Sequence, residues 1–451
     1  MQGNSIHGMW SSRLAFILAA SGSAVGLGNI WRFPYLASDN GGGAFVLIYL
    51  GCIALVGLPI MAAEILMGRH GRMSPVNTLR KLTSEGGHSR GWVAIGWIGL
   101  VAAVMILSFY SVVGGWTLHY AWLYVVQIFG GAPITDPGAT FGAMLGSPGT
   151  LVFWHTVFML LTVGVVAMGV EKGLERAVKF LMPLLFLILL GLLAYGISTG
   201  KVGQAFEFLF TPDFSEVTGS TWLAALGQAF FSLSLGMCGI MTYGAYLPKD
   251  ISIPRVATTV AITDTSVALL AGLAIFPVLF AFGLDPAGGG PGLIFTSLPL
   301  AFNDMAFGIP YAVAFFVLLA VAAWTSSISL LEPPTAFIVE KGRFSRRSAA
   351  LLAAVGIWAL GLVTALGFNV WASVRIFGRD LQGAVEFIAS DLMLPVGGLL
   401  IAIYAAWFLG KQISRSELSH LSDTGFGIWK FLCGVLAPGM VLVILYMKLF
   451  G

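Results

Sequence analysis

Charged residues are scarce in this chain, and cysteines are scarcer still. Only 10% of the 451 residues are charged and three are cysteine, whereas 58% are hydrophobic and the mean hydropathy is +0.92. Cys52, Cys238 and Cys433 lie far apart in apolar stretches, which predicts neither a disulfide framework nor a metal cluster. Basic runs with interleaved aromatics are missing, so we expect no nucleic-acid partner. The patterns HExxH, GxSxG and CxxC are also missing, which argues against an intramembrane enzyme.

Long apolar stretches dominate what is present. Crossing the ~30 Å of hydrocarbon in a bilayer takes roughly 20 residues as a helix. Eleven stretches meet this length: 14–36, 44–67, 93–128, 151–170, 178–198, 222–246, 256–282, 309–339, 349–369, 384–409 and 429–449. The sequence therefore predicts an all-α polytopic membrane protein with the lipid bilayer as its surroundings. No soluble domain is visible, so we expect residues 1–451 to form one transmembrane domain.

The basic residues predict the orientation. Loops on the cytoplasmic side of a membrane protein carry an excess of Lys and Arg. With a cytoplasmic N-terminus, five of the 23 basic residues fall outside, and the other 18 fall inside; the five are Arg32, Lys201, Arg375, Arg379 and Lys448. We therefore expect the N-terminus in the cytoplasm and the C-terminus on the outer face. Two segments rich in Gly and Pro, 130–150 and 284–308, are expected to be outer loops.

The first apolar stretch is interrupted by "GSAVGLGNIWRFP" at residues 22–34. Unwound backbone at membrane depth is tolerated only where it is buried in protein or lines a cavity. The carbonyls freed at the end of one half-helix suit a cation, and the N–H groups that begin the next suit a carboxylate. Gly22, Gly26 and Gly28 let a ligand approach this backbone, although glycines also permit close helix packing. Asn29 adds a polar group that packing does not need, and it favours a binding site.

A second glycine-punctuated break, "FFSLSLGMCG" at 230–239, lies five stretches after the first. An odd number of spans per half makes the second half enter the membrane in the opposite direction. Paired breaks in inverted halves predict a binding site near the middle of the membrane. We expect one repeat over 14–198 and the other over 222–409, with broken helices 1 and 6, while the eleventh helix, 429–449, stands outside the repeat.

These motifs resemble the neurotransmitter:sodium symporter family. The resemblance rests on "GSAVGLGNIWRFP", on "NGGGAF" (40–45), on "GQAFFSLSLG" (227–236) and on "TSSIS" (325–329), and it covers nearly the whole chain. Because inverted repeats are a known property of this family, the repeat is not independent support for the resemblance. With eleven spans, the chain resembles a bacterial branch of this family, which includes transporters of hydrophobic amino acids. The resemblance thus implies a multi-pass protein of the bacterial inner membrane.

The resemblance implies two sodium sites built from oxygen ligands. One site would use the Ala24 carbonyl, the side chains of Asn29, Ser232 and Asp264, and the carboxylate of the substrate. The other would use the carbonyls of Gly22, Val25 and Ala322 and the hydroxyls of Thr325 and Ser326. A carboxylate shared between substrate and ion would make their binding cooperative. Chloride-dependent relatives carry asparagine where this chain has Asp264, so we expect no chloride requirement.

The resemblance also implies a substrate site and gates. Residues expected at the substrate are Ala24, Gly26, Gly28, Ile106, Tyr110, Phe231, Ser232, Ser234, Met237, Ser326 and Leu330. Tyr110 would donate its hydroxyl to the substrate carboxylate, and Phe231 would close over it. Relatives that carry amines without a carboxylate have aspartate at position 26, so Gly26 predicts an amino acid. An apolar compartment favours a hydrophobic or aromatic one. Gate positions are Arg32 with Glu386 on the outer side, and Trp10, Tyr246 and Glu340 on the inner side.

The roles of several residues near the ends of the spans or inside them are less well defined by the sequence. His7 stands where relatives have a basic residue at the inner gate, so either this gate is weaker or Arg13 serves instead. Glu64 is expected to bond the unwound backbone of the first helix, and Glu332 has no assigned role. Gly173 and Pro183 match a pattern that lets the fifth helix of relatives unwind, or they are an ordinary turn and a tolerated proline.

Other functions remain as alternatives. The substrate class could be another carboxylated amine or an amino-acid-like osmolyte, and a nontransporting amino-acid sensor would keep the same site. A channel would need rings of polar residues from symmetric positions, which the two breaks do not provide. The oligomeric state is not predicted.

Overall fold

The structure is a computed structural model that describes residues 6–284 and 290–450. Helices make up its regular structure, and the described residues hold only isolated β-bridges, between Gly42 and Pro212 and between Ile376 and Arg379. The all-α fold predicted from the sequence is therefore confirmed. The α-helices are α1 Arg13–Ala24, α2 Phe33–Asp39, α3 Gly43–Cys52, α4 Leu58–Gly71, α5 Pro75–Glu85, α6 Ala94–Ile128, α7 Pro137–Leu145, α8 Pro148–Val166, α9 Arg176–Ser198, α10 Val202–Phe210, α11 Gly219–Ser232, α12 Gly239–Ala245, α13 Ile253–Ala281, α14 Leu298–Asp304, α15 Gly308–Val339, α16 Arg346–Gly367, α17 Leu381–Glu386, α18 Leu394–Ile403, α19 Lys411–Glu417, α20 Asp423–Phe431 and α21 Ala437–Phe450.

Short π-helical segments continue several of these helices without ending them. They are Gly28–Arg32, Ile53–Gly57, Val170–Glu175, Leu293–Ser297, Phe387–Met393, Tyr404–Phe408 and Leu432–Leu436, and two 3₁₀ segments lie at Arg90–Val93 and Phe214–Glu216. In the described residues, nine continuous helices are long and apolar enough to cross a membrane. They are Gly43–Gly71, Arg90–Ile128, Pro148–Val166, Val170–Ser198, Ile253–Ala281, Gly308–Val339, Arg346–Gly367, Leu381–Phe408 and Asp423–Met447.

The two remaining expected spans are the broken ones. Arg13–Ala24 and Gly28–Asp39 together are long enough to cross a membrane and are bent by 50° at the break. The expected sixth span consists of α11 and α12, which are 14 and 7 residues long. Ten of the eleven spans are thus found by length, and the count of eleven, like the inverted repeat, stays a prediction.

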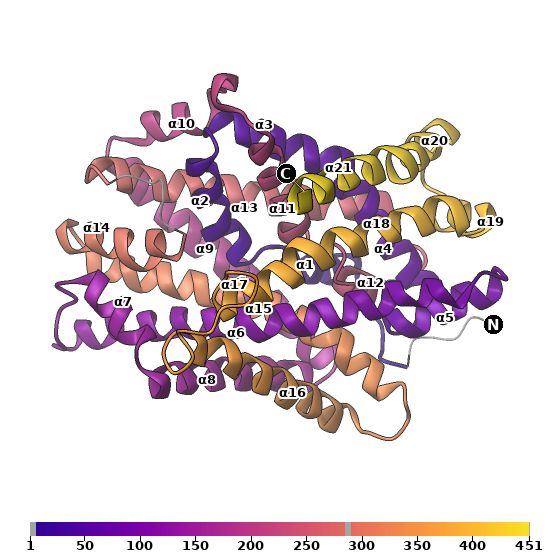
Figure 1. The fold of residues 1–451 in the computed structure, drawn as a ribbon, viewed down its shortest axis with the longest axis horizontal. Coiled ribbons are helices and arrows are strands. Elements are labelled where there is room, and N and C mark those ends of the chain that lie inside the picture. Colours follow the sequence, from indigo (N-terminus) through magenta and orange to yellow (C-terminus); the bar gives the residue numbers. More distant parts are fainter. Residues whose placement is uncertain (1–5, 285–289, 451) are drawn as a thin grey trace.

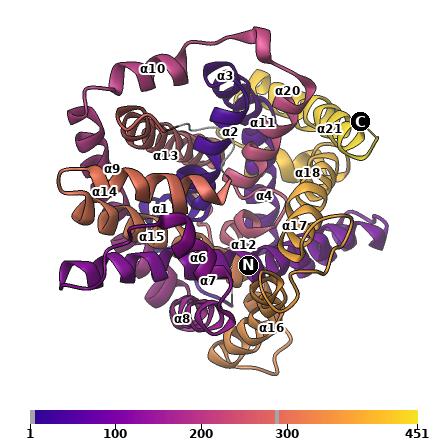
Figure 2. The same ribbon diagram turned by 60° about the vertical axis from the view of Figure 1, so that its left-hand side comes forward.

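The helices run side by side along the long axis of the molecule (Figure 1). α5, α19 and the first described residues lie at one end, on the right in Figure 1, which we call the N-terminal end; α7 and α14 lie at the opposite end. α6 and α15 pack along each other, α12 packs on α4, and α13 packs on α9. In Figure 2, helices α1, α4 and α12 lie near the middle of the bundle, with α8, α10, α16 and α20 around them. The two breaks therefore lie in the interior of the bundle, where their residues are buried.

The two Gly- and Pro-rich connections contain helices that the sequence did not predict. α7 lies within 130–150, where Asp136 caps it by accepting from the Ala139 N–H at 2.9 Å. Proline at the first turn is compatible with a helix, because the missing N–H would have no partner there. α14 and a π-helical segment lie within 284–308, of which residues 285–289 lie outside the described part. The sequence indicated outer loops here and did not predict the short helices within them.

Candidate functional site

The first break separates α1 from the π-helical segment Gly28–Arg32. Val25 leaves helical geometry, with ψ of 109°, while its N–H still donates to the Ser21 carbonyl at 2.6 Å. In the second break Ser234, Gly236 and Cys238 all have positive φ, at 55°, 79° and 58°. Gly236 also lies against the backbone of α18, so a side chain there would meet the Leu394 carbonyl group. Positive φ is unfavourable for Ser and Cys, and such strain persists where the surroundings impose it.

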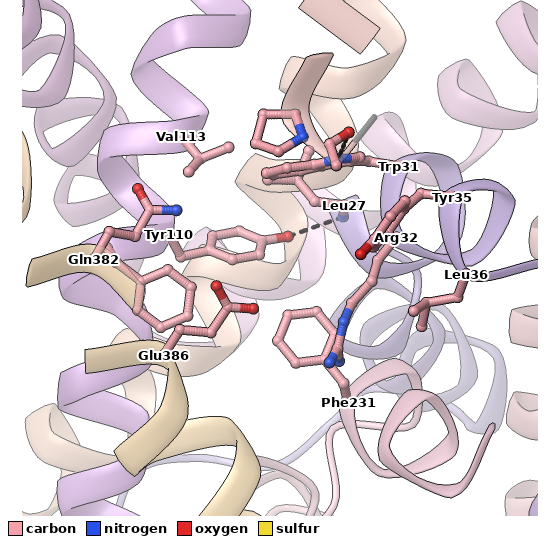
Figure 3. Close-up of a pocket in the computed structure, with 13 residues that line it drawn as sticks. Leu27, Trp31, Arg32, Tyr35, Leu36, Tyr110, Val113, Phe231, Gln382 and Glu386 are labelled. Atoms are coloured by element: carbon pink, nitrogen blue, oxygen red, sulfur yellow. Dashed lines mark hydrogen bonds between the residues drawn. The ribbon is translucent and has the colours of Figure 1, made fainter. Parts of the chain in front are cut away.

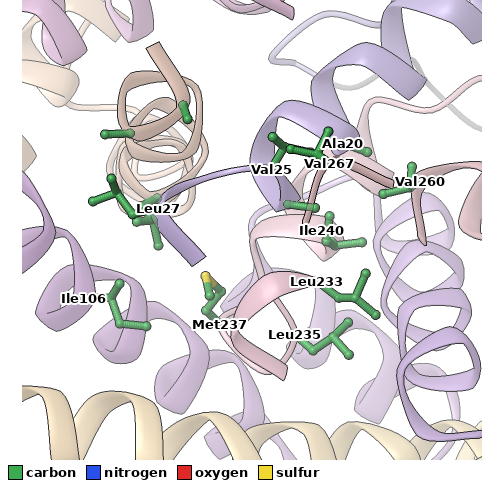
Figure 4. Packing of buried hydrophobic residues seen from close by; sticks show 14 of the residues in the cluster. Ala20, Val25, Leu27, Ile106, Leu233, Leu235, Met237, Ile240, Val260 and Val267 are labelled. Carbon is green, nitrogen blue, oxygen red and sulfur yellow. The ribbon is translucent and has the colours of Figure 1, made fainter. Parts of the chain in front are cut away.

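Apolar side chains from both breaks hold these unwound segments in place. Val25 and Leu27 from the first break and Leu233 and Leu235 from the second are buried, and they lie in one cluster with side chains of α13 (Figure 4). Unwound backbone needs such packing, because no water is present at membrane depth to solvate its N–H and C=O groups.

A small buried cavity of about 20 Å³ lies between the two breaks. Its volume is enough for about one water molecule. Its lining comes from both breaks and from α6 and α15, namely Ser23, Ala24, Gly26, Gly28, Ile106, Tyr110, Phe231, Ser234, Met237, Ser326 and Leu330. Ten of the eleven residues expected at the substrate line this cavity. The eleventh, Ser232, lies beside it, and its hydroxyl donates to Asp264 Oδ2 at 2.6 Å.

Polar groups around this cavity engage the freed backbone of the first break. The Leu27 N–H donates to the Tyr110 hydroxyl at 3.1 Å, and the Gly26 N–H donates to Asn29 Oδ1 at 3.0 Å. A Cβ at position 26 would lie 2.7 Å from the Tyr110 hydroxyl and would collide with the Ser326 side chain. Only glycine fits at this position without a shift of its neighbours.

A larger cavity of about 310 Å³ (Figure 3) shares part of its lining with the small one. Tyr110 and Phe231 line both cavities and so form the wall between them. Arg32 and Glu386 come from different helices and both line the larger cavity, and the guanidinium carbon of Arg32 lies 4.9 Å from the centre of the Phe231 ring. The two expected outer-gate residues are therefore brought to the same cavity as the aromatic wall.

A buried cluster of oxygen atoms with one carboxylate lies on one side of the small cavity. Asn29 Nδ2 donates to Asp264 Oδ1 at 2.7 Å and contacts Ser232 Oγ at 3.1 Å. The Tyr49 hydroxyl lies 3.3 Å from Ser232 Oγ and 3.5 Å from Asp264 Oδ2. All four side chains are fully buried. A buried carboxylate is costly unless it is hydrogen-bonded or paired, and this one has both carboxylate oxygens engaged.

A second oxygen cluster joins α1 to α15. The Ser326 hydroxyl lies 3.2 Å from the Val25 carbonyl and 3.4 Å from the Gly22 carbonyl. The Thr325 hydroxyl lies 3.0 Å from the Ala322 carbonyl and 3.5 Å from that of Val25. These five oxygens carry no formal charge. Carbonyl and hydroxyl oxygens suit a hard cation, whereas softer metals such as zinc and copper favour thiolate or imidazole ligands.

The N-terminal end of the bundle is closed by the expected inner-gate residues. Trp10 is buried, its backbone N–H donates to the Tyr246 carbonyl at 3.0 Å, and its indole donates to the Tyr243 carbonyl at 3.1 Å. Glu340 lies 2.9 Å from His7 Nε2 and accepts from Ser74 and Asn77. Burial raises the pKa of Glu340, but the hydrogen bonds from His7, Ser74 and Asn77 outweigh it, so the net pKa lies below the usual value. His7 is thus the partner of Glu340, whereas Arg13 is exposed.

Two further acids find partners that the sequence did not specify. The Tyr246 hydroxyl donates to Glu332 Oε1 at 2.7 Å, and Arg346 donates to Glu332 Oε2 at 2.5 Å. Glu64 accepts from the backbone N–H groups of Gly236 at 2.8 Å and Met241 at 3.2 Å. The expectation that Glu64 bonds the first broken helix was therefore wrong, since its partners lie in the second break.

Sequence reasoning missed Tyr49, Gln228 and Ser23. Gln228 donates to the Gly28 carbonyl at 2.8 Å, and the Ser23 carbonyl accepts from Ser234 at 2.8 Å. Gln228 lies within a motif quoted above, which was the available signal. An aromatic such as Tyr49 in an apolar span carries no such signal, because it reads as ordinary packing.

Comparison with known proteins agrees with this geometry. A sequence model described as the sodium:neurotransmitter symporter family matches residues 7–128 and 140–450. YhdH, an uncharacterised sodium-dependent transporter of Bacillus subtilis, is 36% identical over 98% of this chain and 97% of its own. An uncharacterised sodium-dependent transporter of Haemophilus influenzae is 34% identical over 98% of each chain. The crystal structure of MhsT in complex with L-phenylalanine is 42% identical, with a TM-score of 0.90 over 98% of this chain and 100% of that one.

Fold and site together define a multi-span membrane transporter, not an enzyme, built around two broken helices. The chain belongs to the sodium:neurotransmitter symporter family. The resemblance seen in its motifs is thereby confirmed, and with it the use of sodium.

Proposed function

We propose that this chain is a sodium-coupled symporter that imports a hydrophobic or aromatic amino acid. One observation carries the proposal. A cavity lined by both broken helices lies between a carboxylate-bearing oxygen cluster and a neutral one. This is the arrangement that a carrier needs if ion and substrate are to bind together.

Two sodium ions are assigned to the two clusters. The neutral cluster of Gly22, Val25, Ala322, Thr325 and Ser326 would take one ion, because five oxygens suffice for a hard cation. The other ion would be held by the Ala24 carbonyl, by Asn29, Ser232 and Asp264, and by the substrate carboxylate. Substrate and ion would each raise the affinity for the other, because they share this carboxylate. The fixed charge of Asp264 would replace a bound anion, so transport would not need chloride.

The substrate side chain would lie among Ile106, Met237 and Leu330, with Ser234 at the edge. The Tyr110 hydroxyl accepts from Leu27, which leaves its proton to donate to the substrate carboxylate. Met237 is flexible enough to adapt to different apolar side chains. A volume of about 20 Å³ is too small for any amino acid, so the cavity would widen when substrate binds, with Phe231 as the side chain that we expect to move. The L-phenylalanine named for the MhsT crystal structure supports an aromatic substrate.

Transport would alternate between the two ends of the bundle. Phe231 would separate the small cavity from the larger one, which Arg32 and Glu386 line, whereas Trp10 and Tyr246 are buried at the N-terminal end beside Glu340. We assign the N-terminal end to the cytoplasm and the C-terminus to the outer face of a bacterial inner membrane, on the excess of basic residues in the inner segments. On this assignment the conformation is closed to the cytoplasm.

A binding screen tests the proposal. The purified protein is heated with each of the twenty amino acids in sodium or in potassium, and the melting temperature is measured. A ligand that binds the folded state raises it. We expect stabilisation by hydrophobic or aromatic amino acids in sodium only, and none by tryptamine or isoamylamine, which lack the carboxylate. Equal stabilisation by tryptamine and tryptophan would overturn the carboxylate assignment.

A further inference from the structure

The segment just before α1 is held from two sides at the N-terminal end of the bundle. Trp10 attaches it to α12 through the carbonyls of Tyr243 and Tyr246. The next residue, Ser11, attaches it to the π-helical segment Val170–Glu175. The Ser11 backbone N–H donates to Glu175 Oε2 at 3.0 Å, and its hydroxyl donates to Glu175 Oε1. Only the first of these attachments involves a residue expected from the sequence to act in gating.

The acceptor is a buried charge that no part of the transport site uses. Glu175 is 3% exposed, and Lys179, one helical turn later, donates to its Oε1 at 2.6 Å from a half-exposed position. Hydrogen bonds to a carboxylate are roughly twice as strong as neutral ones. A buried carboxylate that loses its donors is penalised further. Separation of α1 from this segment would remove the two hydrogen bonds from Ser11 and leave the one from Lys179, so Glu175 carries a cost of separation.

The same element reaches the neutral oxygen cluster. Along α9, which continues from Glu175, the Met182 sulfur would lie 3.2 Å from a Cβ at Gly22. Gly22 supplies one carbonyl of that cluster. The fifth span thus contacts Ser11, just before α1, and lies close to Gly22 near the other end of α1. Movement of α1 away from Glu175 would also uncover this cluster toward the N-terminal end.

The segment that carries Glu175 has a local geometry that is rare in helices. π-Helical turns interrupt the regular α-helical hydrogen-bond pattern and occur frequently at functional sites. Gly169, directly before the segment, has φ of 92°, a conformation that favours glycine. Pro183 in α9 removes one backbone hydrogen bond from the helix. These features place Glu175 on the least regular part of the fifth span.

We propose that Glu175 is a gating residue that latches α1 in the state closed at the N-terminal end, and that the Ser11–Glu175 contact must break before sodium and substrate leave on that side. This inference deepens the proposed function and rests on it for the direction of release. Glu175 acts through α1, so it is a positioning residue and does not touch substrate.

Hydrogen–deuterium exchange of the α1 peptide tests the latch without substrate or added labels. Exchange of a helix that opens locally is faster in proportion to the open population. Four variants of the full chain are compared in detergent or nanodiscs with potassium as the cation. They are Ser11→Asp, Glu175→Gln, the double variant, and Glu171→Gln as control, an exposed acid in the same π-helical segment.

We expect Ser11→Asp to set two carboxylates against each other and to accelerate exchange of α1 roughly tenfold or more. In the double variant this effect should disappear, because the amide introduced at position 175 donates to the carboxylate at position 11 instead of repelling it. Glu171→Gln should match the wild type. Equal acceleration by Ser11→Asp with and without Glu175→Gln would overturn the latch, as would an unchanged rate.

A fifth variant keeps the test valid if Ser11→Asp does not fold. Ser11→Ala removes one hydrogen bond and adds no charge, so it should accelerate α1 exchange several-fold; an unchanged rate would again overturn the proposal. Amino-acid binding by the wild type in sodium is measured separately. If the wild type did not bind an amino acid in sodium, the proposed function would be refuted, whereas the exchange rate of α1 tests the latch alone.

Discussion

Replacing Asp264 with asparagine tests the charge in the first ion cluster. The carboxylate accepts from Asn29 at 2.7 Å and from Ser232 at 2.6 Å, and all three are fully buried. An ion held among these side chains would lie within ~4 Å of the carboxylate. Two unit charges at that separation interact by about 4 kcal/mol at an effective dielectric of 20.

Asparagine keeps an oxygen ligand and lowers the cost of burial, so part of that energy is retained. We expect sodium affinity to fall by roughly 100-fold, equal to about 2.7 kcal/mol. Added chloride should restore part of the affinity in the variant and leave the wild type unchanged. Sodium titrations of amino-acid binding, with chloride or gluconate as the anion, measure both effects. Unaltered sodium affinity in Asp264→Asn would refute the assignment of this carboxylate to the ion.

Three other groups of contacts can be tested by substitution. Thr325→Ala with Ser326→Ala removes two of five neutral ligands, so sodium-driven uptake should fall to background; a well-expressed double variant with normal uptake contradicts this. Gly26→Ala places a Cβ 2.7 Å from the Tyr110 hydroxyl, so calorimetry should show amino-acid binding weakened at least tenfold (about 1.4 kcal/mol). Burial raises the pKa of Glu417, but the interactions with His70 and Arg69 lower it by a larger amount, so the net pKa lies below the usual value. The stabilisation by the charged Glu417 is therefore lost as the pH falls through this lowered pKa. Glu417→Gln should therefore flatten the loss of thermal stability below about pH 4, and an unchanged pH profile would contradict this.

Much of the fold could be predicted because the bilayer constrains it strongly. Apolar length alone located ten spans, and the interruption at Gly22–Pro34 marked the first break. The helices α7 and α14 were not predicted, since their Gly and Pro residues are typical of turns. Proline at a helix start and a capping Asp136 fit both structures, and packing against neighbouring helices decides between them.

The site was predictable where a motif carried it and not where a contact joined distant segments. Asn29, Ser232 and Asp264 come from three spans, and the resemblance to the family placed them together. Tyr49 completes the same cluster, but a tyrosine in an apolar stretch has no pattern of its own. Glu64 was expected on the wrong break, because the sequence shows that a buried carboxylate needs N–H donors but not which unwound segment packs against it.

Sodium-driven accumulation tests the central claim most directly. The purified protein is reconstituted in liposomes with an inward sodium gradient, and uptake of radiolabelled L-phenylalanine or leucine is followed over time. We predict accumulation above the external concentration, lost when potassium replaces sodium and preserved when gluconate replaces chloride. Binding without accumulation, or uptake that does not depend on sodium, would contradict a sodium-coupled symporter.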